Sequence, residues 1–465
     1  MSQFEYDVAV IGGGPAGYVG AIRAAQMGGK VVLFEKDRVG GTCLNRGCIP
    51  TKTYLKTAET LYAVREAGSR GIVMDPTASV DMKKVVAYKD KVVSTLTGGV
   101  AGLLKSNGVK VVNGEASLKD EHSILCNGAV VTAANILLCG GSAAGRVPIP
   151  GIDNPNVLDS TGMLALTELP KRLCIIGGGV IGCELGDAFA AFGSQVTIIE
   201  AMDRLVATQD EDVSAELFKK MKEKGIAVHL GESVCAIEQA GEETKVVCKN
   251  VSVSCDKILL SIGRKADLSC LGDMKDKLKT ERGKLVVNEY MQTNIPNIYA
   301  PGDVNGKLML AHAAFKMAEV AAENAMGEKK RCDLRCTPGC IYTIPEAASV
   351  GMSEKDAASK YGADNILVGK FPMTANGRSL AAGEKSGFVK VITEKKYNEL
   401  LGVHIVGADA AEMIAEPAAL MQMEVTVDEA ANLIHGHPTF SEAFMEACAD
   451  ALGRCIHLPA RKQSK

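Results

Sequence analysis

"YDVAVIGGGPAGYVGAIRAAQMGGKVVLFEK" spans residues 6–36 and decides the fold of the first part of the chain. A short apolar run rich in β-branched residues precedes Gly12, Gly14 and Gly17, and an alanine-rich stretch follows them. A second apolar run ends in Glu35, 18 positions after the last of these glycines. The pattern predicts a strand, a glycine turn, a helix and a second strand, which together begin a doubly wound α/β sheet.

The same pattern returns in "KRLCIIGGGVIGCELGDAFAAFGSQVTIIEA" at 171–201. The two stretches align without gaps at a constant offset of 165. With that offset, the three glycines and the acidic residue of the first stretch coincide with Gly177, Gly179, Gly182 and Glu200. A single offset over the whole stretch indicates two copies of one structural unit.

Each part of this unit has a separate physical role. The first glycine permits the tight turn, the second lets the backbone approach a pyrophosphate, and the third lets the helix pack on the strand. The helix N-terminus offers N–H donors to phosphates, and the acidic residue accepts hydrogen bonds from ribose hydroxyls. Tight packing alone is the alternative, but the full context favours dinucleotide binding by both copies. Glu200 favours NAD over NADP because a carboxylate repels a 2′-phosphate, although the nearby Arg204 weakens this inference.

The bulk properties restrict the function further. The 465 residues suggest about three domains. Apolar residues make up 47% and charged residues 23%, and the net charge of −3 gives no reason to expect a nucleic acid or an anionic membrane as partner. The N-terminus lacks a basic signal-peptide pattern, and no stretch approaches about 18 apolar residues. We therefore expect a cytoplasmic protein whose 15 cysteines are mostly reduced, and in which a persisting disulfide is catalytic or redox-sensing.

The rest of the chain changes its pattern twice. Residues 210–225 are typical of an amphipathic helix with a glycine stop, and residues 257–264 of a buried strand leading into a turn. Residues 282–303 suggest a return to the first domain, and the chain beyond 336 suggests antiparallel strands followed by helices. The expected domains are a first nucleotide-binding part at 1–145, a second nucleotide-binding domain at 146–267, a returning segment at 268–335 and a third domain at 336–465.

Two cysteines stand close together in "GGTCLNRGCIPTK" at 40–52. A structural disulfide in so small a ring would contribute little, and a zinc site usually needs a second closely spaced pair. The evenly spaced Cys332, Cys336 and Cys340 suggest a metal site only weakly, because Pro338 and Gly339 interrupt them and no histidine is near. A redox role therefore fits Cys43 and Cys48 best. Pro50 would suit the first turn of a helix, and a helix N-terminus stabilises a thiolate.

This cysteine segment resembles that of the flavin-dependent pyridine nucleotide-disulfide oxidoreductases, and the similarity runs the whole length of the chain. "TNIPNIYAPGD" (293–303) is similar to the family's second flavin motif, and "LMLAHAA" (308–314) to the stretch beside it. "CIYTIPEAASVG" (340–351) and "FPMTANGRSL" (371–380) resemble signatures of the interface domain. "HGHPTFSEA" (435–443) resembles the family's catalytic histidine–glutamate segment.

The resemblance implies an α/β fold of two Rossmann-like dinucleotide-binding domains plus a C-terminal α+β dimerisation domain. It implies FAD and NAD as cofactors and a homodimer in which one subunit serves the disulfide of the other. The implied catalytic residues are Cys43, Cys48, His437, Glu442, Lys52 and Glu184. The implied cofactor-binding residues are Gly12, Gly14, Gly17, Glu35, Lys36, Gly41, Thr42, Lys52, Gly114, Asp303, Ala311, Gly177, Gly179, Val180, Ile181, Gly182, Glu200, Val234 and Gly263.

The histidine–glutamate pair also makes chemical sense. A dithiol substrate needs a base to become nucleophilic, and histidine titrates in the right range. We expect His437 to be that base, Glu442 to orient it, and His435 to support the structure. Taken alone, a His-x-His-Pro turn is more often a structural loop. The resemblance implies that Lys52 and Glu184 approach one another beside the flavin and the nicotinamide; the alternative for each is a solvated surface charge.

Within the family, Glu200 disfavours the NADPH-dependent members, and Cys448 and Cys455 form no vicinal C-terminal pair. We therefore expect the chain to oxidise protein-bound dihydrolipoamide and to pass hydride to NAD+. The partner would be a lipoyl-bearing protein of a 2-oxoacid dehydrogenase or glycine-cleavage complex, and which complex stays open. A reductase of another low-molecular-weight disulfide and an NADH-responsive redox sensor without turnover are the alternatives.

Three features depart from the family pattern. They are the segment from Cys139 to Ser142, Arg46 between the two cysteines, and Ile344 at a position that is often polar. None of them removes a reacting group. We expect Arg46 to influence the disulfide's potential, because a nearby cation favours thiolate.

Overall fold

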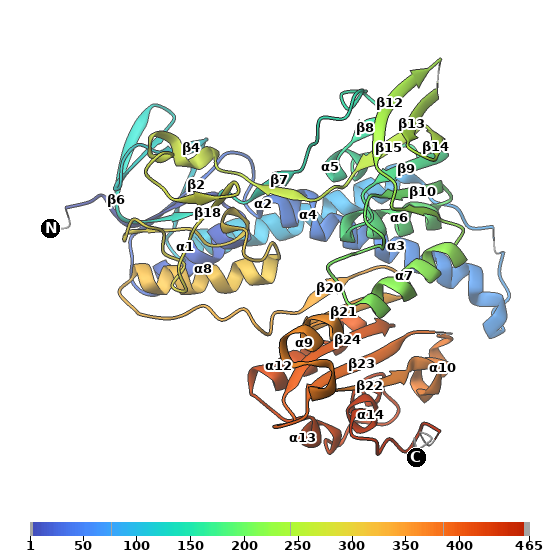
Figure 1. Cartoon of the computed structure of the whole chain (residues 1–465). Helices are drawn as coiled ribbons and strands as arrows, with labels where there is room; N and C mark the ends of the chain where they lie inside the picture. Colours follow the sequence, from blue (N-terminus) through green and yellow to red (C-terminus); the bar gives the residue numbers. More distant parts are fainter. Residues whose placement is uncertain (1–2, 76, 242, 385, 460–465) are drawn as a thin grey trace.

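The chain folds into three lobes, shown in Figure 1. The structure is a computed structural model that describes residues 3–75, 77–241, 243–384 and 386–459. The N-terminal lobe contains the first strands together with the later helix α8 (Ala311–Ala325). The second lobe follows in green, and the C-terminal lobe, in orange and red, lies beneath the second.

The sheet of the N-terminal lobe is built on parallel strands. Their order is β3 (Lys110–Asn113), β2 (Val31–Glu35), β1 (Tyr6–Ile11), β6 (Ala129–Leu138) and β19 (Ile298–Tyr299). β5 (Ser123–Cys126) and β4 (Ala116–Leu118) extend the β6 side in antiparallel fashion. All five residues of β2 are buried, which explains its continuous apolar run. The chain returns to this sheet at β19 after passing through the second lobe.

The second lobe repeats the order of the first four of these parallel strands, but its fifth strand comes before the other four in sequence. Its parallel sheet runs β11 (Ala227–Leu230), β10 (Gln195–Glu200), β9 (Arg172–Ile176), β15 (Lys257–Leu260) and β8 (Val157–Leu158). Three antiparallel strands, β12 (Val234–Ala240), β13 (Glu243–Cys248) and β14 (Ser252–Cys255), lie between β11 and β15 in sequence. The helices α1 (Pro15–Gln26) and α6 (Val180–Phe192) occupy equivalent places in the two lobes. The predicted internal repeat is therefore present at the level of the fold.

Two helices carry the N-terminal segment toward the second lobe. α2 (Gly41–Arg46) is short, α3 (Cys48–Glu66) follows after one residue, and α4 (Met82–Ser106) runs alongside (Figure 1). The buried side chains of α3, among them Tyr54, Leu55 and Ala58, share a core with Phe189 of α6. The ring centroids of Tyr54 and Phe189 are 6.1 Å apart. α3 thus packs against the second lobe, although its sequence falls within the first predicted domain.

The C-terminal lobe is an antiparallel sheet covered by helices. The strand order is β20 (Gly339–Ile341), β21 (Glu346–Gly351), β24 (Leu400–Gly407), β23 (Phe388–Glu394) and β22 (Ile366–Pro372). Every residue of β23 and β24 is buried. The accompanying helices are α9 (Glu354–Tyr361), α10 (Gly377–Ala382), α11 (Ala410–Met413), α12 (Ala415–Gln422), α13 (Val427–Ala431) and α14 (Glu442–Ala451).

Shorter elements complete the chain. β7 (Ser142–Ala144) pairs with β16 (Arg264–Ala266) where the chain enters and leaves the second lobe. The others are α5 (Ser160–Met163), α7 (Glu211–Glu223), β17 (Thr280–Glu281) and β18 (Lys284–Leu285), with 3-10 turns at Ala67–Arg70, Ser269–Met274, Asp303–Asn305, Ala363–Asn365 and Met373–Ala375. The predicted fold class is confirmed, whereas the three boundaries between the four predicted segments stay predictions.

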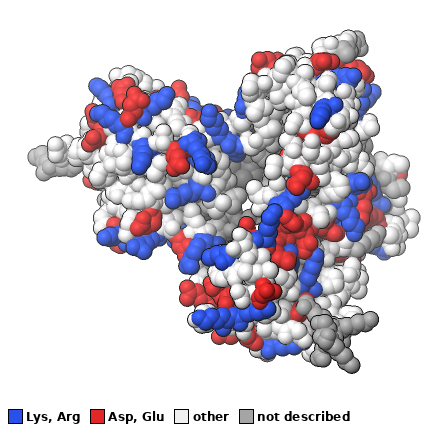
Figure 2. All heavy atoms as spheres, in the orientation of Figure 1, with Lys and Arg blue, Asp and Glu red and all other residues white. Residues whose placement is uncertain are grey.

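The surface carries both signs of charge. Figure 2 shows lysine and arginine interspersed with aspartate and glutamate over the visible face. This mixture agrees with the small net charge of −3. In the described part of the chain, no helix combines the length and the apolar character needed to cross a membrane.

Candidate active site

The two glycine turns have the geometry that nucleotide binding requires. A Cβ on Gly12 (φ +101°) would lie 2.3 Å from the carbonyl oxygen of Cys139, and one on Gly17 would lie 1.7 Å from that of Gly12. In the second copy, a Cβ on Gly182 would lie 2.1 Å from the carbonyl oxygen of Gly177. Only glycine fits these positions, because the helix and the turn are in backbone contact.

The helices that follow these turns leave their first N–H groups open. Gly14 and Gly179 are the N-cap residues of α1 and α6, and neither helix has a side-chain cap or an acidic residue in its first turn. Val180 and Ile181 begin α6. An uncapped helix N-terminus presents N–H donors and a positive dipole end. Both turns therefore fit the pyrophosphate of a dinucleotide.

The acidic residue of each copy is held by the backbone in the same way. Glu35 accepts hydrogen bonds from the N–H groups of Gly13 (2.6 Å) and Asp37 (2.8 Å). Glu200 accepts them from Gly178 (2.6 Å) and Met202 (2.7 Å), again at an offset of 165. Each carboxylate is thereby fixed beside its glycine turn, with acceptor capacity left for ribose hydroxyls.

Arg204, which could attract a 2′-phosphate, is engaged elsewhere. Its guanidinium lies 2.7 Å from Glu211 and donates to the carbonyl oxygen of Ala207 at 3.0 Å. The positive charge of Arg204, which weakened the inference that Glu200 selects NAD over NADP, is thus paired within the protein.

The thiols lie on both sides of a break between two helices. Cys43 is in α2, Gly47 separates the helices, and Cys48 is the first residue of α3. All fifteen cysteines lie within the described residues and are unbridged in this structure. Gly41 packs against the first turn, since a Cβ there would lie 2.5 Å from the Cα of Gly14. The helix that carries Cys43 therefore packs against the first glycine turn.

The two thiols differ in acidity. A hydrogen bond from Cys43 and the nearby Lys52 ammonium together lower the pKa of Cys48 to about 7, against the opposing effects of burial and Glu184. The same hydrogen bond raises the pKa of Cys43. Cys48 is consequently the thiol that carries the negative charge near neutral pH.

Arg46, between the cysteines, forms an ion pair with the carboxylate of Asp37. Both side chains are substantially exposed, so water screens this pair. The expected effect of Arg46 on the disulfide's potential stays a prediction.

Lys52 and Glu184 form an ion pair between the lobes. The Lys52 ammonium lies 2.9 Å and 3.0 Å from the two carboxylate oxygens of Glu184. Only 4% of the Glu184 side chain is exposed, and the N–H of Tyr342 donates to it at 2.9 Å. Because Lys52 follows Cys48 by one helical turn, this pair lies close to the thiols.

His437 and Glu442 form the second pair that the sequence predicts. His437 Nδ1 lies 2.9 Å from the carboxylate of Glu442, which also accepts from the N–H of Thr439 at 2.7 Å. Burial acts against ionisation of Glu442, but these two contacts hold its pKa below the usual range. The His437 side chain is 79% exposed. His435 contacts Glu416 at 2.8 Å, which suits a structural role.

The histidine and the thiols lie in different lobes. His437 precedes α14 at the bottom of the molecule, whereas α2 lies between the upper lobes (Figure 1). One chain therefore does not bring its own base to its own thiols. A site shared between two subunits would resolve this separation.

The remaining predicted cofactor residues lie at or next to the ends of strands and helices. Asp303 begins a 3-10 turn, and its carboxylate accepts a hydrogen bond from the Ser142 hydroxyl at 2.5 Å. The Ser142 hydroxyl oxygen itself accepts a hydrogen bond from Arg264 Nε at 2.7 Å. Arg264 also reaches Thr42 Oγ1 at 3.5 Å. The N–H of Glu232 donates to the carbonyl oxygen of Glu200, so the segment leading to Val234 lies beside the second acid. The others are Lys36 after β2, Gly114 after β3, Gly263 after β15 and Ala311 at the start of α8.

Sequence reasoning missed two residues that connect the lobes here. The ring centroid of Tyr342 lies 4.3 Å from the Lys52 ammonium. Asp187 accepts from the N–H of Ile344 at 2.7 Å and pairs with Lys224 at 2.6 Å. The only sequence signal was that Tyr342 and Ile344 fall within the interface-domain signature at 340–351.

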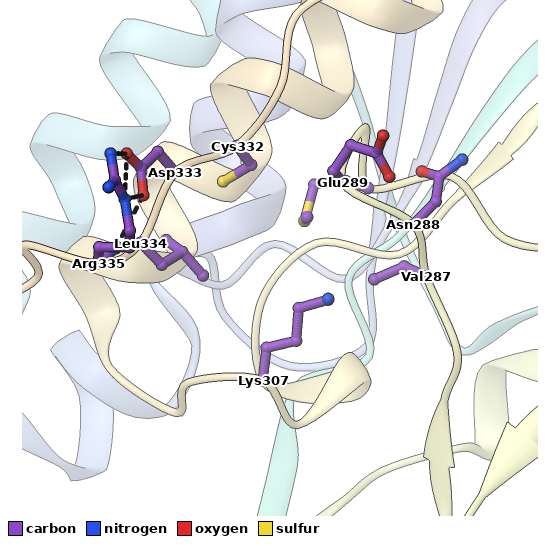
Figure 3. A pocket seen from close by; sticks show the side chains of 9 residues that line it. Val287, Asn288, Glu289, Lys307, Cys332, Asp333, Leu334 and Arg335 are labelled. Carbon is purple, nitrogen blue, oxygen red and sulfur yellow. Dashed lines mark hydrogen bonds and ion pairs between the residues drawn. The ribbon is translucent and has the colours of Figure 1, made fainter. Parts of the chain in front are cut away.

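The evenly spaced cysteine trio does not form a cluster. Cys332 packs against the N-terminal core, whereas Cys336 and Cys340 pack against the C-terminal core. Cys332 instead lines a cavity of about 630 Å³ with Lys307, Asp333 and Arg335 (Figure 3). In the described residues, no group of three or more His, Cys, Asp or Glu side chains is arranged to hold a metal ion. This cavity lies outside the predicted site, because none of the residues that line the cavity is a predicted catalytic or cofactor-binding residue.

Comparison with known proteins identifies the family. Residues 6–318 match the family described as "Pyridine nucleotide-disulphide oxidoreductase", and residues 337–448 match its dimerisation domain. The chain belongs to this family. It is an FAD-dependent disulfide oxidoreductase that works with NAD, and its dimerisation domain supports a homodimer.

Individual relatives narrow the comparison. The dihydrolipoyl dehydrogenase of Bacillus subtilis (strain 168) is 40% identical over 457 residues, covering 97% of this chain and 99% of the relative. Dihydrolipoyl dehydrogenases of Thermus scotoductus (40% identical) and Chlamydia muridarum (38% identical) match over 97% and 98% of this chain, and over 99% of each relative. The HOCl-induced flavoprotein disulfide reductase RclA from Escherichia coli superposes with a TM-score of 0.85 at 30% identity, covering 95% of this chain and 99% of that chain.

Proposed function

We propose that this chain is a dihydrolipoyl dehydrogenase that oxidises the dihydrolipoyl group of a partner protein and transfers the electrons to NAD+. Relatives with this name match almost the whole chain at about 40% identity. The single observation that carries the proposal is the dithiol at the break between α2 and α3, with Cys48 acidified beside Lys52.

The reaction begins with Cys43 and Cys48 joined by a disulfide bond. His437, oriented by Glu442, removes a proton from one substrate thiol. The resulting thiolate attacks the sulfur of Cys43, so a substrate–Cys43 bond forms and the Cys43–Cys48 bond breaks. Cys48 leaves as a thiolate, which its low pKa and the Lys52 ammonium stabilise.

The second substrate thiol then attacks the substrate sulfur that is bonded to Cys43, and its proton passes to the departing Cys43 sulfur. The lipoyl ring closes, Cys43 is released and accepts a proton, and the pair is left two electrons richer. FAD, when bound, accepts that electron pair from the dithiol and supplies hydride to NAD+. The net change is dihydrolipoyl plus NAD+ to lipoyl, NADH and one proton.

The nucleotide sites have separate tasks. Gly12, Gly14 and Gly17, with Glu35 and Asp303, would hold FAD. Gly177, Gly179, Gly182 and Glu200 would hold NAD, with Glu184 beside the nicotinamide. The Lys52–Glu184 ion pair joins α3, which begins at Cys48, to α6, which follows the second glycine turn, so it would lie between the residues that hold FAD and those that hold NAD.

The pair of His437 and Glu442 would act on the disulfide of the partner subunit. Its exposure and its separation from the thiols of its own chain support this arrangement. The lipoyl group would arrive on a carrier of a 2-oxoacid dehydrogenase or glycine-cleavage complex. A cytoplasmic location stays a prediction.

A substrate panel tests the proposed function. Lipoamide, glutathione disulfide and coenzyme A disulfide are each assayed with NADH and with NADPH. We expect turnover with lipoamide and NADH to exceed every other combination by at least about 100-fold, because Glu200 disfavours a 2′-phosphate and one dithiol fits the site. Preferential reduction of either other disulfide would contradict the proposal.

A further inference from the structure

Tyr342 contacts both members of the ion pair near the thiols. Its main-chain N–H donates to Glu184 at 2.9 Å, and its ring centroid lies 4.3 Å from the Lys52 ammonium. Lys52 is in α3, Glu184 is in α6, and Tyr342 lies in the C-terminal lobe between β20 and β21. All three lobes of the chain therefore contribute to this contact.

The main chain around Tyr342 is fixed on α6. The N–H groups of Tyr342 and Ile344 donate to Glu184 and Asp187, which lie three residues apart on one helix face. Asp187 is completely buried, and so is Thr343 between the two donors. These contacts hold the main chain that carries the ring, and the ring also packs against the core that α3 and α6 share.

The Tyr342 ring attracts the Lys52 ammonium electrostatically. A cation near the face of an aromatic ring is attracted by the ring's quadrupole, most strongly where water is excluded. The Lys52 side chain is 30% exposed, and Glu184 opposite it is almost fully buried. The ammonium therefore has a negative partner on one side and an aromatic face on another.

We propose that Tyr342 is a positioning residue that holds the Lys52 ammonium where it stabilises the thiolate of Cys48. The proposal deepens the proposed function and rests on the redox role of Cys48 in it. The charged or titratable groups that act on Cys48 are Cys43, Lys52 and Glu184. Those that act on Tyr342 are Cys340, Glu346, Glu184 and Glu412.

The test measures thiolate formation without any substrate. The FAD-loaded enzyme is reduced anaerobically by one electron pair, and its long-wavelength absorbance, which reports a thiolate beside the flavin, is followed against pH. For Tyr342→Phe, which keeps the ring, we expect the wild-type midpoint. For Tyr342→Leu we expect the midpoint to rise by about one pH unit, with kcat lowered about 3- to 10-fold.

A graded series separates electrostatics from packing. Fluorinated phenylalanines at position 342 keep the shape of the ring but weaken its negative face. We expect the midpoint to rise stepwise with each added fluorine, and this readout remains available if Tyr342→Leu fails to bind FAD. Tyr361→Leu is the matched control, because Lys360 lies 4.8 Å from that ring in the same lobe and outside the site; its midpoint should equal that of wild type.

The outcomes are distinct. An unchanged midpoint through the fluorinated series would overturn the positioning role of Tyr342 and would leave the proposed function intact. A wild-type enzyme that shows no long-wavelength absorbance at any pH would instead contradict the redox role of Cys48, and with it the proposal.

Discussion

At the scale of single residues, the chemistry depends on the difference between two neighbouring thiols. The pKa of Cys48 is lowered from its ordinary value of 9.0 to about 7, whereas that of Cys43 is raised. The thiolate of Cys48 is therefore present above about pH 7 and is lost as the pH falls through that value. We expect the alkylation rate of Cys48 by iodoacetamide in the reduced enzyme to rise with a midpoint near pH 7 and to level off by about pH 8. A midpoint near 9 would show that Cys48 is an ordinary thiol.

Replacing one cysteine at a time by serine tests which thiol forms the thiolate beside the flavin. We expect Cys48→Ser to bind FAD but to lose the long-wavelength absorbance of the half-reduced enzyme, because the thiolate beside the flavin is gone. Cys43→Ser is the matched variant; it has no disulfide to reduce, and its Cys48 thiolate should produce this absorbance with the flavin still oxidised. The spectra of both variants, recorded anaerobically, decide the matter; the reverse pattern would mean that the two cysteines have exchanged roles.

Sequence reasoning found the residues whose spacing carries chemistry. Cys43 and Cys48 stand close together, and Lys52 follows Cys48 by one turn, so these groups had to lie near one another once a helix formed. Tyr342 was missed because its contact with Glu184 joins positions 158 residues apart. No local pattern reports which loop of one lobe meets which helix of another.

At the scale of elements, the repeated glycine turns allow the two nucleotide sites to be separated. A Cβ on Gly182 would lie 2.1 Å from the carbonyl oxygen of Gly177, so α6 could not pack on its turn without a backbone shift. We expect Gly182→Ala to raise the Kd for NADH at least about 30-fold, which corresponds to about 2 kcal/mol, while the FAD content is unchanged. Fluorescence titration with NADH measures this.

The control for that experiment is a glycine in an exposed helix. A Cβ on Gly102 of α4 meets nothing within 4 Å. Gly102→Ala should leave the Kd for NADH unchanged and stabilise the chain by about 0.5–1 kcal/mol, because alanine loses less backbone entropy in a helix. Equal weakening of NADH binding by both variants would show that the effect of Gly182→Ala is not local.

The elements themselves were largely predictable, but their partners were not. Strand, turn and helix follow from β-branched runs, glycines and alanines, and the offset of 165 predicted that both sheets begin alike. The sequence of α3 has apolar residues at helical spacing, yet it does not tell which lobe they face. In the structure they pack against Phe189 of the second lobe, because the helix that starts at Cys48 runs away from the first sheet.

At the scale of the whole molecule, the proposed mechanism needs two subunits to complete each site. The dimerisation domain is present, the His437 side chain is exposed, and α14, which follows His437 in sequence, lies in a different lobe from α2. We expect Cys43→Ser and His437→Ala homodimers to be inactive, and a heterodimer of the two variants to recover up to about half of the wild-type activity through its one intact site. Differently tagged chains allow the heterodimer to be isolated and assayed. An inactive heterodimer that retains FAD would count against a shared site.

The arrangement of the lobes was accessible from the sequence only through resemblance. Residue patterns predicted two nucleotide units and a third layer pattern beyond residue 336, but not that Glu184 and Asp187 of α6 bind the main chain that enters the third lobe. Buried carboxylates meeting backbone N–H groups leave no periodic trace in a sequence.

The most direct test of the account is an anaerobic reductive titration of the purified FAD-loaded enzyme. Dithionite is added stepwise while the flavin absorbance and the long-wavelength absorbance are recorded. The account predicts uptake of two electron pairs per subunit, the first reducing the Cys43–Cys48 disulfide and producing the long-wavelength absorbance, the second bleaching the flavin. Uptake of a single pair that bleaches the flavin from the first addition would contradict a redox-active dithiol in contact with the flavin.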